Sequence, residues 1–158
     1  MRSVQNRFSP KRTLLGLLLA TLIGVTFAYD HQNRTRIRDI LLTSIHSSNI
    51  LIQSNNYQML SFNLYSLKEA NPFVNSLGIY MLGEKRTGFG DLPDDFILAQ
   101  NSLPDAVNVR MTGFFSYDAY YLFSNTQTLL YGNFSEPSRV WVLSLIYLVT
   151  LLSFGLIY

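Results

Sequence analysis

Two stretches of the chain are mainly apolar and carry no charged residue. They are Thr13–Tyr29 and Val140–Tyr158, and every charge of the sequence lies outside them. As helices they would rise about 26 Å and about 29 Å, close to the thickness of the hydrocarbon core of a bilayer. The pattern predicts two transmembrane helices, at 13–29 and 140–158, with a tail at 1–12 and one domain at 30–139 between them.

The tail at 1–12 predicts the orientation of the first helix. Its four charged residues are all basic: Arg2, Arg7, Lys11 and Arg12. Because basic flanks stay on the cytoplasmic side, we expect a cytoplasmic N-terminus and an extracytoplasmic segment at 30–139. That segment carries eight basic and ten acidic residues. The overall basic balance therefore indicates topology and argues against nucleic acid as a partner.

A cleaved signal peptide is the alternative for the first apolar stretch. Thr26-Phe27-Ala28 has the small-x-small form of a cleavage site. The bulky Phe27 and Tyr29 crowd that site, and the pattern predicts that a polar helix continues beyond it. We therefore interpret the stretch as an uncleaved anchor.

After the first apolar stretch the pattern is helical. One face of the expected helix has its residues at the i, i+3, i+4, i+7 spacing: Ile37, Ile40, Leu41, Ser44, Ile45, Ser48 and Ile52. Ser54-Asn55-Asn56 breaks this helix. A second helix is predicted at Tyr57–Ala70, and it ends before Pro72 because the residue preceding a proline disfavours the helical region.

From Phe73 the period becomes that of β-strands. Five strands are predicted, at Val74–Leu82, Thr87–Gly90, Ala106–Phe115, Asp118–Ser124 and Thr128–Phe134. The expected connections are a turn at Gly83–Arg86, a loop at Asp91–Pro104 with one helical turn at Asp95–Asn101, and a hairpin at Asn125–Gln127. The order predicts an α+β fold, in which one five-stranded antiparallel sheet carries the N-terminal helices on one face.

This layout resembles the extracytoplasmic PAS-like (Cache/PDC-type) sensor modules of bacterial two-transmembrane signalling proteins, such as sensor histidine kinases and diguanylate cyclases. The likeness lies in residues 41–93. It consists of a helix, a break and a second helix, then Asn71-Pro72-Phe73-Val74 entering a first strand, and a hairpin from Gly83 to Gly88. The resemblance implies a bacterial inner-membrane location, a homodimer, and signal transmission by helix movement.

The sequence departs from that family in one respect. Members of the family continue past the second membrane helix into a cytoplasmic output domain, and none follows Tyr158 here. We therefore expect either that the chain is a fragment or that a membrane-protein partner supplies the rest.

The sequence has no enzyme signature. It contains no cysteine and only two histidines, His31 and His46, with no metal-ligand spacing around them. Asp91, Asp94 and Asp95 lack the spacing of a calcium loop. We expect no catalytic residues, no bound metal and no cofactor, which makes an envelope hydrolase improbable.

A ligand site is predicted on the strands. Arg110 lies centrally on a strand, where its guanidinium could hold a carboxylate by two hydrogen bonds. Polar-tipped residues on neighbouring strands would frame that site: Tyr80, Tyr117, Asp118 and Tyr120. The alternative is that Arg110 faces solvent and that the aromatic residues are core or dimer packing.

The apolar stripe of the first helix allows two interpretations. As a dimer seam it would use Ile37, Leu41, Ile45 and Ile52, and two such helices side by side could carry movement across the bilayer. The same stripe could instead pack against the sheet.

Two functions follow from these observations. The first is a membrane-anchored sensory module that passes ligand or envelope state to the cytoplasmic side. The second is a small accessory inner-membrane protein that binds and stabilises or regulates a membrane-protein partner.

Overall fold

The computed structural model describes most of the chain. The described residues are 10–93, 105–113, 115–124, 128–135 and 137–157, with side chains described from Thr13 and, in the last stretch, at 141–153. Three expectations lie outside them: the tail at 1–9, the helical turn at 95–101 and the hairpin connection at 125–127.

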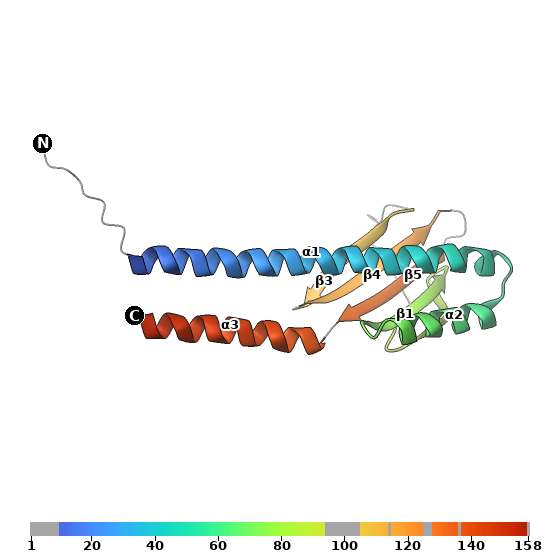
Figure 1. The fold of residues 1–158 in the computed structure, drawn as a ribbon. Coiled ribbons are helices and arrows are strands. Elements are labelled where there is room, and N and C mark those ends of the chain that lie inside the picture. The colour runs from blue at the N-terminus through green and yellow to red at the C-terminus, as the bar shows by residue number, and fades with distance from the viewer. Residues whose placement is uncertain (1–9, 94–104, 114, 125–127, 136, 158) are drawn as a thin grey trace, which may run out of the picture. The chain divides into compact units, whose positions relative to one another are not determined.

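The chain divides into two compact units. The first, the hairpin unit, comprises residues 1–32 and 138–158, and the second, the sheet unit, comprises residues 33–137. One helix, α1 at Pro10–Gln53, contributes to both (Figure 1). The expected continuation of the first apolar stretch into a polar helix is therefore confirmed.

Helix α1 ends where the sequence predicts. Asn55 adopts a positive φ of 54°, its N–H bonds the Ile52 carbonyl, and the Asn56 N–H bonds the Leu51 carbonyl at 2.9 Å. This is a Schellman cap, which asparagine tolerates because its short polar side chain accepts the left-handed conformation. The Asn56 side chain then caps α2, Tyr57–Ala70, by accepting from the Met59 N–H.

Five antiparallel strands form one sheet in the order β2-β1-β5-β4-β3. Their bounds are β1 Val74–Met81, β2 Glu84–Phe89, β3 Val107–Gly113, β4 Ser116–Phe123 and β5 Thr128–Ser135. The predicted α+β class and the five-stranded antiparallel sheet are confirmed. Strands β2 and β3, consecutive in the chain, are the two edge strands of the sheet.

The first hairpin turn is tighter than predicted. Leu82 and Gly83 alone connect β1 to β2, and both have positive φ values, 54° and 88°. A two-residue turn of this type matches the twist of the strands it joins. Residues Glu84–Arg86, predicted as part of the turn, are consequently the start of β2.

The β3–β4 connection also differs from the prediction. Phe115 was expected at the end of a strand, but it has a positive φ of 53° and lies between β3 and β4. Its side chain is buried. Burial of the ring compensates a backbone conformation that is unfavourable for a bulky residue.

Both helices pack on one face of the sheet, which we call the helix face. Asn33 of α1 donates to the Tyr117 hydroxyl, and Tyr65 of α2 stacks on Phe89 with ring centroids 5.3 Å apart. The core of the sheet unit lies here, with fully buried side chains at Ile37, Leu41, Leu60, Leu64, Leu77, Ile79, Leu130 and Phe134.

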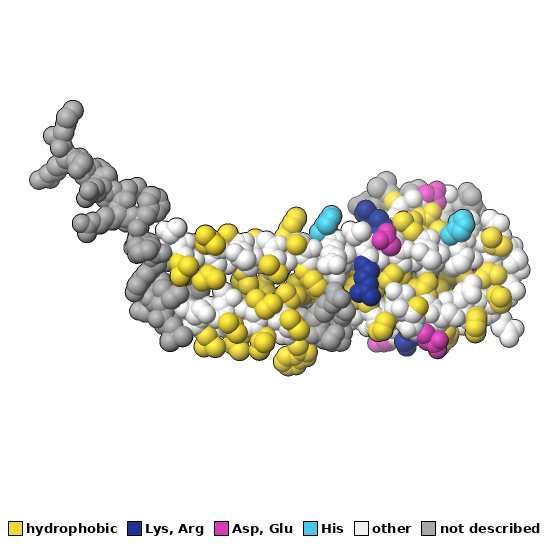
Figure 2. Space-filling model, viewed as in Figure 1, with side chains coloured by type: hydrophobic (Ala, Val, Ile, Leu, Met, Phe, Trp, Pro, Cys, Tyr) yellow, Lys and Arg dark blue, Asp and Glu magenta, His cyan; other side chains and the backbone are white. Residues whose placement is uncertain are grey.

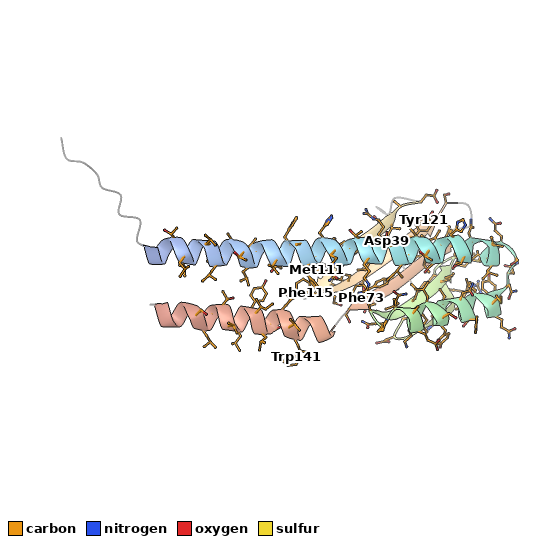
Figure 3. The ribbon with its side chains drawn as sticks, in the orientation of Figure 1. Asp39, Phe73, Met111, Phe115, Tyr121 and Trp141 are labelled. Atoms are coloured by element: carbon orange, nitrogen blue, oxygen red, sulfur yellow. The ribbon has the colours of Figure 1, made fainter. Side chains whose placement is uncertain are left out.

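The hairpin unit contains the N-terminal part of α1 and helix α3, Pro137–Ile157. The Thr26 and Tyr147 hydroxyls are hydrogen-bonded to each other, which links the two helices by their side chains. Hydrophobic side chains cover both helices in Figure 2, and Trp141 projects away from α1 with 78% of its surface exposed (Figure 3).

The described residues contain one helix long and apolar enough to cross a membrane, Thr13–Gln53 within α1. Length and composition are the basis of that finding. The expectation of two such helices is met only in part, because the described part of α3 is a shorter apolar helix, Trp141–Ser153.

Candidate functional site

The face of the sheet opposite the helices carries most of its polar and tyrosine side chains. Residues directly opposite on neighbouring strands share a face, so the register places these side chains together. We call this the polar face, and it comprises Ser76, Tyr80, Asn108, Arg110, Asp118, Tyr120, Tyr131 and Asn133.

A row of hydrogen bonds crosses the polar face from β1 to β4. The Asn75 amide donates to Asn133 Oδ1 at 2.9 Å, and the Asn133 amide donates to Asp118 Oδ1 at 2.8 Å. The Tyr131 hydroxyl is also hydrogen-bonded to Asp118. The side chains of Asn133 and Tyr131, both on β5, therefore hold the Asp118 carboxylate in position.

The pKa of the Tyr131 hydroxyl reflects this arrangement. Burial of its ring raises the pKa of the Tyr131 hydroxyl well above its ordinary value of 10.0, and the negative charge of Asp118 raises it further. Burial disfavours the charged form of the tyrosine hydroxyl, and the Asp118 carboxylate repels a second negative charge beside it. The hydroxyl therefore stays protonated and donates throughout the physiological range.

The chain just after β2 covers one side of the polar face. The Tyr80 hydroxyl donates to the Pro93 carbonyl at 2.6 Å, and Leu92 lies over Gly78. Gly90 has a φ of +79°, and a Cβ there would come within 2.4 Å of the Asn75 carbonyl oxygen. Only glycine lets the chain turn this close to β1. Tyr80 is therefore buried, with its ring edge-on to Tyr131 at 6.4 Å.

The register brings four of the five predicted ligand residues onto this face. Tyr80 is buried, Asp118 and Tyr120 are half-buried, and Arg110 is exposed on the edge strand directly opposite Asp118. The Arg110 side chain makes no hydrogen bond or ion pair with any other residue that the structure describes.

Tyr117 lies on the other side of the sheet. It is fully buried on the helix face, where Asn33 donates to its hydroxyl and the Arg34 guanidinium lies 5.9 Å from its ring centroid. Successive side chains of a strand point to opposite faces of the sheet. Tyr117 therefore lies on the face opposite to that of Asp118 and Tyr120. Tyr117 thus connects β4 to α1.

Sequence reasoning missed Tyr131, Asn133 and Asn75. Nothing in the sequence places Asn133 beside Asp118, because that neighbour relation depends on the β4–β5 register. The available signal was the alternation in Thr128–Ser135, where Tyr131, Asn133 and Ser135 recur with period two among apolar residues and a glycine.

The predicted seam residues are used inside the sheet unit. Ile37, Leu41 and Ile52 are buried by the chain itself, and Ile45 is half-buried. This placement agrees with the second interpretation of the stripe, in which it packs against the sheet.

Other polar candidates do not assemble into a site. The described residues hold no group of three or more metal-ligating side chains. His46 on α1 and Asp91 after β2 are both exposed. Asn33-Arg34-Thr35 has the form of an N-glycosylation site, but Asn33 is buried and bonded to Tyr117.

No protein-family model, curated protein or solved structure matches this chain.

Proposed function

We propose that the chain is a membrane-anchored extracytoplasmic sensory module. The observation that carries this proposal is that a single helix, α1, includes both the apolar segment long enough to cross a membrane and residues that pack on the sheet. Any rearrangement of the sheet that repositions Asn33 or Ile37 acts on the same helix that would enter the bilayer.

The proposed ligand site is the polar face, and strand β4 would couple it to α1. Asp118 faces the ligand side, while the adjacent Tyr117 contacts Asn33 on the helix side. A ligand that shifts β4 by binding near Asp118 would therefore also shift Tyr117 against α1. Such a ligand acts through its different affinities for two arrangements of the sheet.

Arg110 would supply the charged contact of this site. Its guanidinium fork matches a carboxylate in geometry, and Tyr120 lies on the same face of the next strand. The ligand class that follows is a carboxylate with an apolar or aromatic body.

The proposed topology has two membrane helices. Residues 13–29 would run from the cytoplasm outward behind the basic tail, and residues 140–158 would return, so that residues 30–139 lie outside a bacterial inner membrane. Trp141 would sit at the interface. We also propose that the chain forms a homodimer.

A thermal-shift experiment tests the ligand site. The full chain in detergent is heated with a panel of small carboxylates. A true ligand at ten times its dissociation constant stabilises by about 1.4 kcal/mol, which raises Tm by roughly 5 °C. We expect Arg110→Ala to abolish that rise and the control Arg86→Ala, on the opposite edge strand, to retain it. A rise that Arg110→Ala leaves unchanged would remove Arg110 from the site.

The accessory function is the second candidate, and exposed apolar side chains favour it. Phe62 on α2 is 66% exposed, and Leu82 at the β1–β2 turn is 70% exposed. A stoichiometric membrane-protein partner in pull-downs, from a chain that binds no compound of the panel, would favour this function over sensing.

A further inference from the structure

Strand β3 is an edge of the sheet, and no described strand pairs with its outer side. It is the last strand in the order β2-β1-β5-β4-β3, and residues from Arg110 to Gly113 are exposed. An edge strand presents a row of backbone N–H and C=O groups that can pair with another extended segment. The two edges of this sheet differ in how far they are protected against such pairing.

The contact of Arg34 shows which backbone groups point outward. Arg34 Nη1 donates to the Val109 carbonyl at 3.0 Å from the helix face, so this carbonyl points away from β4. In an antiparallel ladder alternate residues point the same way. The outward groups of β3 therefore belong to Val107, Val109 and Met111, and apart from the bond to Arg34 no described residue pairs with them.

The β2 edge is protected by charge and shape. Glu84, Lys85 and Arg86 follow one another on it, Arg86 is paired with Glu84 at 3.3 Å, and the β1–β2 register shifts between Ile79 and Tyr80. Charges and bulges are the usual means by which proteins prevent edge pairing. Strand β3 also has a register shift, between Met111 and Gly113, but its single charge is Arg110, which is flanked by Val109 and Met111.

Strand β3 carries an exposed positive charge on the polar face. The guanidinium of Arg110 makes no hydrogen bond or ion pair with a described residue, whereas Arg34 on the helix face is bonded to the Val109 carbonyl. Asp118 lies directly opposite Arg110 on β4, but its carboxylate accepts from the Asn133 amide and makes no ion pair with the Arg110 guanidinium. The complement of this edge is therefore a segment with a negative charge.

We propose that the β3 edge binds an extended peptide segment that carries an acidic side chain. The segment adds as a sixth strand on the backbone groups of Val107, Val109 and Met111. Its apolar residues lie beside Val109 and Met111 on the helix face, and its carboxylate lies opposite Arg110 on the polar face. The inference rests on the proposed function, because it assigns the carboxylate at Arg110 to a peptide.

Val109 can take part in such a ladder while it stays bonded to Arg34. A carbonyl oxygen has two lone pairs, so it accepts from Arg34 and from a peptide N–H together. The bond to Arg34 also holds the outward carbonyl in place before the peptide arrives, which lowers the ordering cost of binding.

The test measures binding of fluorescein-labelled acetyl-Thr-Val-Glu-Val-Thr-amide to the full chain in detergent by fluorescence anisotropy. In this peptide Glu and both Thr share one face and the two Val share the other. Two control peptides separate the contributions. One has Gln in place of Glu, and the other has N-methyl groups at both Val residues and therefore lacks two backbone donors.

We expect saturable binding of the Glu peptide, with an affinity at least about tenfold lower for each control peptide. Arg110→Gln should lose the preference for Glu over Gln, while Arg86→Gln should keep it. Met111→Pro, which removes an outward N–H without touching the β4 ladder, should weaken all peptides alike. Circular dichroism confirms that each variant is folded, and the N-methyl peptide tests the backbone contact independently of any variant.

Three results would overturn the inference. Equal binding of the N-methyl and parent peptides, with displacement by a free small carboxylate, would leave the proposed ligand site and exclude strand addition. Absence of peptide binding up to about 1 mM, in a chain that a small carboxylate stabilises, would lead to the same conclusion. Self-association through β3, seen as a disulfide between copies of Asn108→Cys, would assign the edge to a second copy.

Discussion

Tyr131 combines burial, a hydrogen bond and a neighbouring carboxylate within one residue. The folded chain holds the pKa of Tyr131 above 10.0, first by burial and then by the charge of Asp118, whereas in the unfolded chain this pKa is ordinary. The unfolded state therefore releases the proton at lower pH than the folded state. It follows that Tyr131 makes the folded chain lose stability as pH rises above about 10.

The prediction at this residue is a change in alkaline stability. Tyr131→Phe should flatten the fall in the free energy of unfolding above pH 10, while costing about 1 kcal/mol near pH 7 through the lost bond to Asp118. Urea unfolding from pH 7 to 11 measures both effects. Tyr65→Phe, at an exposed tyrosine whose ring packs on Phe89, is the matched control. An unchanged alkaline slope in Tyr131→Phe would contradict the assignment.

At the scale of elements, the β1–β2 hairpin contains a residue that is unsuited to its turn. Leu82 has a φ of 54° and is mostly exposed, although asparagine and glycine are the residues that favour this position. Leu82→Asn should therefore raise the free energy of unfolding by about 0.5–1 kcal/mol. Thermal unfolding measures the gain. Leu82→Ala is the control and should give none, because alanine keeps the strain and adds no local hydrogen bond.

A second readout separates structure from function at this turn. Residues held in strained backbone conformations cluster at functional sites. The exposed Leu82 side chain is therefore a candidate contact for a protein partner. If Leu82→Asn stabilises the chain and also weakens capture of a membrane-protein partner, the accessory function gains support. Stabilisation without any change in partner capture would leave Leu82 with no role in binding.

The elements differ in how well the sequence predicted them. The break at Asn55–Asn56 and the limits of α2 at Tyr57 and Ala70 followed from side-chain capping and from Pro72, which act over a few residues. The turns at Leu82 and Phe115 did not, because neither residue type signals a positive φ. Tertiary packing fixes such positions, and a local pattern does not contain that information.

The candidate site was predictable only in part for a related reason. Arg110, Asp118 and Tyr120 could be named from their residue types and their strands. Tyr117 was placed with them, although the alternation of a strand sends it to the helix face. The contribution of Tyr131 and Asn133 depends on the β4–β5 register, which only the paired structure specifies.

At the scale of the whole molecule, the prediction concerns topology. The natural chain has no cysteine, so a single introduced cysteine reports one position. In intact cells a membrane-impermeant maleimide should label Asn49→Cys, on the exposed surface of α1, and should leave Ser3→Cys unlabelled until the inner membrane is permeabilised. The labelled fractions are read from gel shifts.

Two outcomes of the labelling would contradict the proposed anchor. Labelling of Ser3→Cys in intact cells would reverse the orientation. A chain that carries no label at Ser3→Cys even after permeabilisation, yet is labelled at Asn49→Cys, would show that a signal peptide had been removed.

The pairing of β1 with β5 has a consequence for how the protein is made. Strand β1 lies between β2 and β5 in the sheet, although β5 is the last strand of the chain. At roughly 5–20 residues per second of synthesis, β1 waits a few seconds for its partner. During that time the apolar Leu77 and Ile79 lie on a sheet that lacks β5, and the edge of β1 that pairs with β5 is exposed. The synthesised chain must therefore avoid aggregation through β1, alone or with a chaperone that covers this strand, until Thr128–Ser135 arrives.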